Sequence, residues 1–186
     1  MAVLKAVRTW LVVAAALHWG GPTPAGQTAP SLEYRVKAVF LFNFAQFVDW
    51  PLAAFPDSQT PVVIGVLGDD PFGPLLDETV RGETLAGRPF EVRRYRRADE
   101  IKACHILFIS QSESDRLEEI LAGLKSRPTL TVGDGEGFSL RGGMVRFVTE
   151  KNRVRLRINL EAVQAANLTI SSKLLRSAEI VTSRKQ

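Results

Sequence analysis

Cysteine is nearly absent from this chain of 186 residues, which contains Cys104 alone. A single cysteine cannot form an intramolecular disulfide, a C-x-x-C redox pair or a cysteine-rich zinc site. Histidine is almost as scarce, with only His18 and His105. A hydrophobic share of 45% and a charged share of 24% are typical of a globular domain, so the composition also excludes intrinsic disorder for the chain as a whole.

The amino-terminal thirty residues have the pattern of a secretory signal peptide. Two cations, Lys5 and Arg8, precede a short apolar run at residues 10–17, and a Gly-, Pro- and Thr-rich stretch follows. An uncleaved membrane anchor is the alternative, but the run is about half of the ~20 residues that cross a bilayer. We expect residues 1–30 to be removed on export to the periplasm and residues 31–186 to form one domain.

Removal of the leader brings the charge close to balance. The leader carries two of the 24 Lys and Arg residues and none of the 20 acids, so 22 cations face 20 anions. Nucleic-acid binding requires a concentrated basic face, so we expect no nucleic-acid partner. The local exception is a group of arginines around Tyr95, which we interpret as a charged edge strand or, alternatively, as a phosphate- or anionic-lipid-binding patch. These arginines are Arg93, Arg94, Arg96 and Arg97.

Cys104 and His105 are adjacent, which suggests a cysteine nucleophile with a histidine base. In an extended strand, however, neighbouring side chains point to opposite faces, so the thiol and the imidazole would diverge. We therefore interpret Cys104 as a small buried thiol and His105 as a residue at the end of a strand. The sequence predicts no catalytic residues, and hence a protein that is not an enzyme.

The hydrophobic period alternates between that of helices and that of strands. Ser31 and Glu33 suit the start of a helix over residues 32–49, which ends before Pro51. This helix is apolar around most of its circumference, so we expect it to be buried under the sheet or against a second subunit. Further helices are expected at residues 72–80, 114–126, 161–166 and 171–180. Strands are expected at residues 62–67, 90–95, 104–109, 129–132, 144–149 and 154–158.

The order of these elements predicts the fold class. Strands separated by helices imply parallel pairing, because parallel neighbours need crossover connections. Lys151 and Asn152 are turn-forming residues between the last two strands and predict an antiparallel hairpin. We expect a single α/β domain with a mixed, mostly parallel sheet between helical layers and a C-terminal antiparallel hairpin at one edge.

Two candidate ligand sites follow predicted strands. The loop at residues 133–137 reads G-D-G-E-G, but a phosphate would meet Asp134 and Glu136, and a strand follows where phosphate loops need a helix. Asp69 and Asp70 could bind a metal at a strand end, although a turn with a helix N-cap explains them at least as well. We predict neither a metal nor a cofactor.

Several segments, taken in order, resemble the YfiR-like family of exported bacterial proteins. They span nearly the whole mature chain: YRVKAVFLFNFAQFVDWP at residues 34–51, GDDPFG at 68–73, ILFIS at 106–110, GGMVRF at 142–147, INL at 158–160 and ANLTISSKLL at 166–175. The resemblance implies a dimeric periplasmic regulator without enzymatic activity, which binds the periplasmic sensory domain of an inner-membrane diguanylate cyclase and holds the cyclase inactive. It also implies a role in cyclic-di-GMP signalling and biofilm control, with an OmpA-like outer-membrane lipoprotein that sequesters the regulator.

The chain departs from this family pattern in its cysteines. Some members have paired cysteines that couple activity to oxidation, whereas Cys104 has no partner, so we expect no disulfide and no internal redox control. Two other functions stay open. One is a periplasmic small-ligand sensor for another membrane partner, such as a histidine kinase or a TonB-linked system. The other is a metal-dependent hydrolase that uses Asp69 or Asp70.

Trp50, Pro51 and Phe55 are the predicted partner-binding residues. Trp50 is the only tryptophan outside the leader, and Phe55 lies in a loop between Ala54 and Pro56. One interpretation is that both rings pack at the bottom of the core. The other is that this corner, together with the exposed part of the first helix, contacts the membrane partner or a second subunit, because interface hot spots favour aromatic residues.

Overall fold

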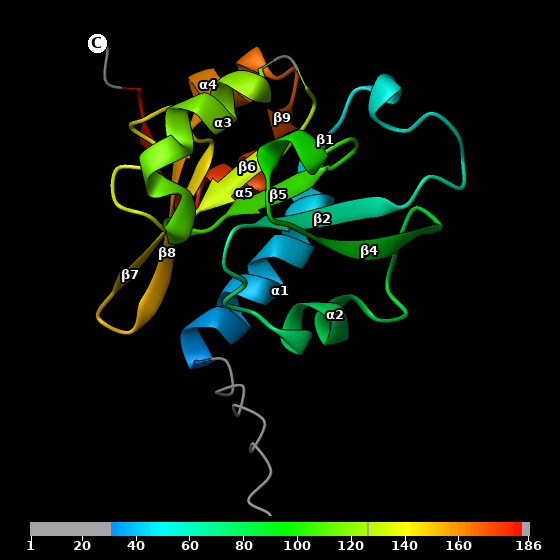
Figure 1. Ribbon diagram of the computed structural model, residues 1–186, viewed down its shortest axis with the longest axis horizontal. Coiled ribbons are helices and arrows are strands. Elements are labelled where there is room, and N and C mark those ends of the chain that lie inside the picture. The colour runs from blue at the N-terminus through cyan, green and yellow to red at the C-terminus, as the bar shows by residue number, and fades with distance from the viewer. Residues whose placement is uncertain (1–30, 126, 184–186) are drawn as a thin grey trace, which may run out of the picture.

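The computed structural model describes residues 31–125 and 127–183, which build a central β-sheet with helices around it (Figure 1). The strands are β1 (Val48–Asp49), β2 (Val62–Leu67), β3 (Thr84–Leu85), β4 (Arg88–Tyr95), β5 (Ile106–Ile109), β6 (Leu130–Gly133), β7 (Val145–Glu150), β8 (Arg153–Asn159), β9 (Thr169–Ile170) and β10 (Ala178–Val181). The helices are α1 (Leu32–Phe47), α2 (Pro74–Val80), α3 (Leu117–Gly123), α4 (Leu160–Ala165) and α5 (Ser172–Leu175), with 3-10 turns η1 (Leu52–Ala54), η2 (Ala98–Glu100) and η3 (Gln111–Arg116).

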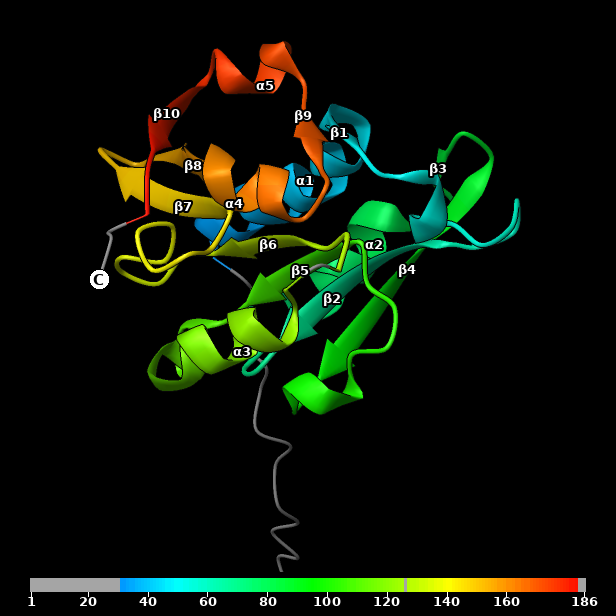
Figure 2. The same cartoon turned by 90° about the horizontal axis from the view of Figure 1, so that it is seen from above.

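Eight of these strands form one sheet in the order β10-β8-β7-β6-β5-β2-β4-β3. The strands β4, β2, β5, β6 and β7 run parallel, and every residue of β2 is buried, as its continuous apolar run predicts. One apolar cluster joins α1 and α2 to one face of the sheet, and a second joins α3 to the other face (Figure 2). The predicted α/β fold, with a mostly parallel sheet between helical layers, is confirmed.

The predicted hairpin is present as β7 and β8, which pair antiparallel. Lys151 and Asn152 form its turn with positive φ angles of 48° and 59°, the conformation that suits the twist of two-residue hairpins. The hairpin does not end the sheet, however, because β10 pairs in parallel with the outer side of β8.

The helix predicted over residues 171–180 is wrong in its second half. The helix α5 ends at Leu175, and the chain then extends as β10, whose Ala178 and Ile180 pair with Leu156 and Ile158 of β8. Pairing with the open edge of β8 satisfies backbone groups, and Ile180 and Val181 are β-branched residues that favour strands.

The boundaries of the first helix also differ from the prediction. The helix ends at Phe47 because Val48 and Asp49 leave it to pair with β9. Ser31 occupies the N-cap position, but its side chain makes no capping hydrogen bond. The predicted helix at residues 114–126 is divided between the end of η3 and α3, and residue 126 lies outside the described ranges.

The predicted signal peptide, at residues 1–30, lies outside the described residues. Within the described ranges, no helix is both long enough and apolar enough to span a bilayer.

Candidate functional site

In open α/β sheets, ligands commonly bind where the strand order reverses, at the carboxyl ends of the strands. Here that point lies between β2 and β5, since the chain passes from β2 to β4 on one side and returns to β5 on the other. Ser112 and the buried Glu113, both from η3, pack against Gly68 at this point, and a Cβ at Gly68 would clash with Ser112. Side chains of η3 therefore fill the space beside Gly68. On the other side of Glu113, between the ends of β5 and β6, about 10 Å³ is left, room for one water at most.

Asp70, a candidate metal ligand, has two structural contacts. Its Oδ1 accepts a hydrogen bond from the Phe72 N–H at 2.8 Å, and its Oδ2 accepts one from Arg94 Nε at 2.7 Å. The predicted turn is therefore confirmed, but the predicted helix cap is wrong, because the N-cap of α2 is Gly73. The Asp69 N–H donates to Ser112 Oγ at 3.0 Å. Across residues 31–125 and 127–183, no three His, Cys, Asp or Glu side chains come close enough to hold a metal ion.

Arg93 and Arg94 lie on an edge strand, as predicted, because β3 pairs only with Arg88 and Pro89 at the start of β4, whereas Arg96 and Arg97 follow the end of β4. Nearby acids neutralise three of them. Arg93 pairs with Glu91 at 2.7 Å, Arg97 pairs with Asp99 at 2.7 Å, and Arg94 joins Asp70 and Asp77. These local ion pairs favour the charged-edge interpretation over a patch for anionic ligands.

The G-D-G-E-G loop anchors α1. Asp134 accepts hydrogen bonds from Lys37 Nζ at 2.6 Å and from the Tyr34 hydroxyl at 3.0 Å. Lys37 is buried and also lies 2.6 Å from Glu33, and its hydrogen bond lowers the pKa of the Glu33 carboxyl. Burial, together with the negative charge of Asp134, raises the pKa of Tyr34. Asp134, whose negative charge is unfavourable for phosphate binding, is therefore the partner of the buried Lys37.

Cys104 and His105 point to opposite faces, as the alternation of an extended chain predicts. Cys104 is buried with Val63, Tyr95 and Leu107 in the cluster on the α3 face. Burial raises the pKa of the Cys104 thiol to about 12, so the reactive thiolate is scarce at neutral pH. The thiol therefore lacks the two properties of a cysteine nucleophile, namely a low pKa and a neighbouring base.

His105 holds the loop that follows α1. The Val63 N–H donates to its Nδ1 at 3.0 Å, and its Nε2 donates to the Ala54 carbonyl oxygen at 3.1 Å. These two backbone partners fix a neutral imidazole with its proton on Nε2. The ring is only 2% exposed, and burial lowers its pKa. His105, which was expected at the end of a strand, is therefore a buried residue whose two hydrogen bonds link β2 to η1.

The structure brings Trp50 and Phe55 together around the imidazole ring of His105. The Phe55 ring stacks on His105 with centroids 4.3 Å apart, and Trp50 meets His105 edge-on at 6.1 Å. The Arg88 guanidinium covers the other ring surface of Phe55, 4.5 Å from its centroid, and donates to the Thr60 carbonyl oxygen. Trp50, Pro51 and Phe55 are all half-buried, and both aromatic rings pack against the main cluster, which favours the core interpretation for the rings themselves.

The large hydrophobic residue exposed at this corner is Leu52, which was not among the predicted partner-binding residues. Leu52 lies in η1 and is 94% exposed, with Ala53 and Pro56 exposed beside it. The available signal was the apolar run from Leu52 to Ala54, which follows a helix-ending proline and fits no helix or strand period. We call the surface formed by Trp50–Pro56 the aromatic corner, and Leu52 is its tip.

An open hollow of about 320 Å³ lies beside the aromatic corner. Ala53, Ala54 and Pro56 form its corner side, and the ends of neighbouring strands form the rest. Among the described residues that line it, the charged ones are Lys102 and Arg127, both exposed, and none is acidic. The tip of the corner is therefore flanked by a basic hollow.

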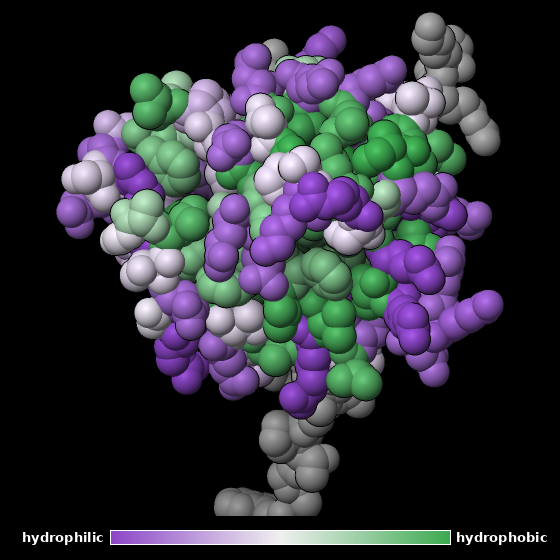
Figure 3. All heavy atoms as spheres, turned by 180° about the vertical axis from the view of Figure 1, so that it is seen from behind, coloured by the Kyte–Doolittle hydropathy of each residue, from purple (hydrophilic) through white to green (hydrophobic). Residues whose placement is uncertain are grey.

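A second exposed apolar surface lies on α1. Leu32, Val36 and Val39 are spaced four and three residues apart and are 78%, 38% and 48% exposed. The opposite side of the same helix, including Ala38, Leu41 and Phe44, is buried in the core. A band of hydrophobic surface is visible on this side of the molecule (Figure 3). We call these three residues the α1 stripe, and they account for the excess of apolar residues in the helix.

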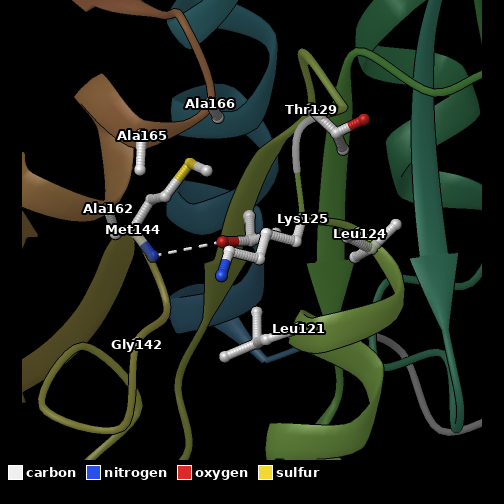
Figure 4. A pocket seen from close by; sticks show the side chains of 10 residues that line it. Leu121, Leu124, Lys125, Thr129, Gly142, Met144, Ala162, Ala165 and Ala166 are labelled. Atoms are coloured by element: carbon white, nitrogen blue, oxygen red, sulfur yellow. Dashed lines mark hydrogen bonds between the residues drawn. The ribbon is translucent and has the colours of Figure 1, made fainter.

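A small pocket separates α3 from α4 (Figure 4). Leu121 and Leu124 of α3 line one side, and the Met144 N–H donates to Thr131 Oγ1 at 3.1 Å in its floor. Its volume of about 130 Å³ is well below the ~300–1,000 Å³ of typical small-molecule sites. This pocket between α3 and α4 therefore gives little support to the small-ligand sensor alternative, whereas the hollow beside the aromatic corner lies within that size range.

Comparison with protein families matches residues 34–179 to the family described as YfiR/HmsC-like. Comparison with curated proteins gives no match. The matched range begins in α1, ends in β10 and contains the aromatic corner, and the resemblance noted in the sequence is thereby confirmed. The chain belongs to the YfiR/HmsC-like family.

Proposed function

We propose that the protein is a periplasmic inhibitor that binds the sensory domain of an inner-membrane diguanylate cyclase and so controls cyclic-di-GMP synthesis and biofilm formation. The YfiR/HmsC-like family consists of periplasmic regulators of diguanylate cyclases. The observation that supports the proposal for this chain is the aromatic corner, a loop that His105 and Arg88 hold in place and that exposes Leu52. The filled space beside Gly68, between the ends of β2 and β5, favours a binding protein over an enzyme.

The aromatic corner has the properties of a binding anchor. Trp50 and Phe55 are held by His105 and Arg88, so the loop loses little conformational freedom on binding. An exposed leucine can then enter an apolar pocket of the partner, while Lys102 and Arg127 meet acidic residues around that pocket. The sensory domain is therefore expected to present an apolar pocket with an acidic rim.

The α1 stripe is proposed as the contact between two copies of the chain. A twofold axis across α1 would bring the stripe against itself and cover three apolar side chains from each copy. The aromatic corner follows the carboxyl end of the same helix and stays available to the cyclase. In this scheme, an OmpA-like outer-membrane lipoprotein relieves the inhibition by sequestering the regulator.

Capture from membranes tests the function. The mature protein serves as bait for detergent-solubilised inner membranes, and the expected product is a diguanylate cyclase with a periplasmic domain. Binding to that purified domain is then measured for Leu52→Ala, which should weaken affinity about thirtyfold, the loss of one hot-spot residue. Leu140→Ala removes another partly exposed leucine and is the matched control. Failure to capture a cyclase would overturn the function, and equal affinities of both variants would remove Leu52 from the interface.

A further inference from the structure

The hairpin of β7 and β8 presents a row of arginines on the side that faces away from α1. Phe147 and Leu156 point into the main core, so the alternate residues of both strands point to the opposite face. That face consists of Arg146, Val148 and Glu150 from β7, Arg153, Arg155 and Arg157 from β8, and Glu179 from β10. Figure 1 shows the hairpin reaching past α3, which leaves its end uncovered. We call this surface the arginine face.

The register of the hairpin places like charges together. Arg146 lies directly opposite Arg157, Val148 lies opposite Arg155, and Glu150 lies opposite Arg153. Like charges in opposite positions destabilise an antiparallel pair. The stability of the hairpin therefore does not explain the choice of arginine at position 146.

Acidic residues neutralise only part of this charge. Glu179 contacts Arg157 at 2.8 Å, and Glu150 reaches Arg155 at 3.6 Å and Arg157 at 3.8 Å. Neither Arg146 nor Arg153 has an acidic partner among the described residues, and Arg146 Nε is buried without a hydrogen-bond partner. Four arginines against two glutamates leave the face with an excess of two positive charges.

The edge strand β4 and the residues directly after it contain arginines that are neutralised within the same protein. There, Arg93, Arg94 and Arg97 each have an acid within 2.7 Å. The arginine face differs because two of its four guanidinium groups, those of Arg146 and Arg153, have no acidic partner among the described residues.

We propose that the arginine face binds the anionic phospholipid headgroups of a membrane. Guanidinium groups donate two parallel hydrogen bonds to a phosphate, and phosphate is the anionic group of such headgroups. The face has no aromatic residue, although protein interfaces are usually centred on aromatic anchors, so a laterally uniform anionic surface fits it better than a protein partner. The proposal rests on the proposed function for its biological setting, where attachment would concentrate the regulator beside a membrane-bound cyclase.

The expected binding is weak, reversible and sensitive to salt. Each arginine at an anionic membrane strengthens partitioning about fivefold, so neutralising two of them weakens it about thirtyfold. Screening shortens the reach of the surface potential to about 10 Å at 0.1 M salt and about 3 Å at 1 M. Binding should therefore be strongest at low salt and lost at high salt.

Co-sedimentation of the mature protein with vesicles tests this proposal. Vesicles of phosphatidylglycerol with phosphatidylcholine should sediment the protein at low salt, whereas phosphatidylcholine alone should not. The double variant Arg153→Gln with Arg155→Gln should weaken this binding about thirtyfold. The matched control is Arg81→Gln with Arg96→Gln, which removes the same charge from exposed positions outside the hairpin and should change binding less than about threefold.

Three results would overturn the proposal. They are absence of vesicle binding at low salt, equal binding to uncharged vesicles, and equal losses in both double variants. Soluble poly-glutamate is the third probe, and a hairpin-dependent affinity for it without affinity for vesicles would assign the face to an acidic protein instead. The vesicle assay contains no cyclase, so its failure leaves the proposed regulatory function intact, and failure to capture a cyclase leaves the vesicle result intact.

Discussion

At the scale of single residues, His105 links most of the aromatic corner to the sheet. Its two ring nitrogens hold Val63 and Ala54, and its ring surface supports Phe55. A charged imidazole carries a proton on Nδ1 as well, where the Val63 N–H already donates, so protonation breaks this hydrogen bond. The corner depends on a neutral histidine.

The first prediction concerns the pH dependence of stability. The pKa of His105 is lowered in the folded protein by burial, whereas the unfolded chain keeps a pKa near 6.5. Below pH 6.5 the unfolded chain therefore binds a proton that the folded chain does not, so stability is full above that pH and falls as the pH drops toward the lowered pKa. Urea unfolding between about pH 7.5 and 5 should show this decline.

His105→Gln is the matched variant for that measurement. Glutamine keeps one donor and one acceptor but does not titrate, so the variant should be less stable at neutral pH and should lose little further stability between about pH 6.5 and 5. A decline as steep as that of the original protein would assign the pH dependence to other groups.

Cys104 gives a second prediction at this scale. A buried thiol with a pKa of about 12 should react with iodoacetamide only when the chain unfolds, so labelling followed by mass spectrometry should rise sharply with urea. A reducing agent should leave the melting temperature unchanged, because Cys104 is the only cysteine of the chain. Rapid labelling of the native protein would show that the thiol is accessible and would make Cys104 a candidate nucleophile again.

The sequence could predict the aromatic residues of the corner but not its exposed tip. Trp50 and Phe55 can be proposed as interface residues because they are aromatic. The exposure of Leu52, by contrast, depends on the loop around it, which is held by His105, about fifty positions along the chain. Exposure of one residue in an irregular loop depends on such distant contacts. Local periodicity contains no information about them.

At the scale of elements, a buried ion pair attaches α1 to the end of β6. Lys37 contacts Asp134 and Glu33, and its ammonium group lies 4.4 Å from the centroid of the Tyr34 ring. The side chains of Lys37 and Asp134 are only 3% and 10% exposed, so water replaces little of the interaction. Such a contact fixes the position of the helix on the sheet.

Removal of Lys37 is therefore expected to be costly. Lys37→Met should lower the free energy of unfolding by about 3–5 kcal/mol, because it leaves the Asp134 carboxylate buried without its cation. The double variant Lys37→Met with Asp134→Asn removes both charges and should recover part of that loss. Urea unfolding at neutral pH measures both. A double variant less stable than the sum of its single variants would contradict the argument.

Most elements followed from the sequence because their hydrophobic patterns are local. The apolar run of β2 and the turn at Lys151 and Asn152 predicted parallel and antiparallel pairing correctly. The strand β10 was missed because its pattern fits a continuation of α5 equally well, and only the open edge of β8 decides between them. The two-residue strands β1 and β9 are defined by each other, and neither has a period of its own.

At the scale of the whole molecule, the aromatic corner lies apart from the other two proposed contact surfaces, and the arginine face points away from α1 and so from the α1 stripe. The α1 stripe begins at the first turn of α1, and the aromatic corner follows its end about 22 Å away, as the rise of the helix gives. The turn of the hairpin lies at the carboxyl ends of the parallel strands, whereas the corner precedes the amino end of β2 (Figure 1). One copy could therefore contact a second copy, a cyclase and a membrane at the same time.

The last prediction tests the contact between copies. Val36→Glu with Val39→Glu places two carboxylates in the α1 stripe, and a twofold axis doubles them to four across the interface. Unpaired charges are costly to bury, so the dissociation constant of the dimer should rise at least about a hundredfold. Both side chains are partly exposed in the single chain, so its folded state should tolerate the change.

Sedimentation equilibrium is the measurement, with the melting temperature as a check on folding. The control, Gln111→Glu with Gln164→Glu, adds the same charge at exposed positions outside α1 and should remain dimeric. A monomeric original protein would contradict the dimer itself, while dimers in both variants would place the interface elsewhere. Dissociation confined to the α1 variant would instead explain the composition of α1: its core side packs on the sheet, and its second apolar side packs on another copy of the chain.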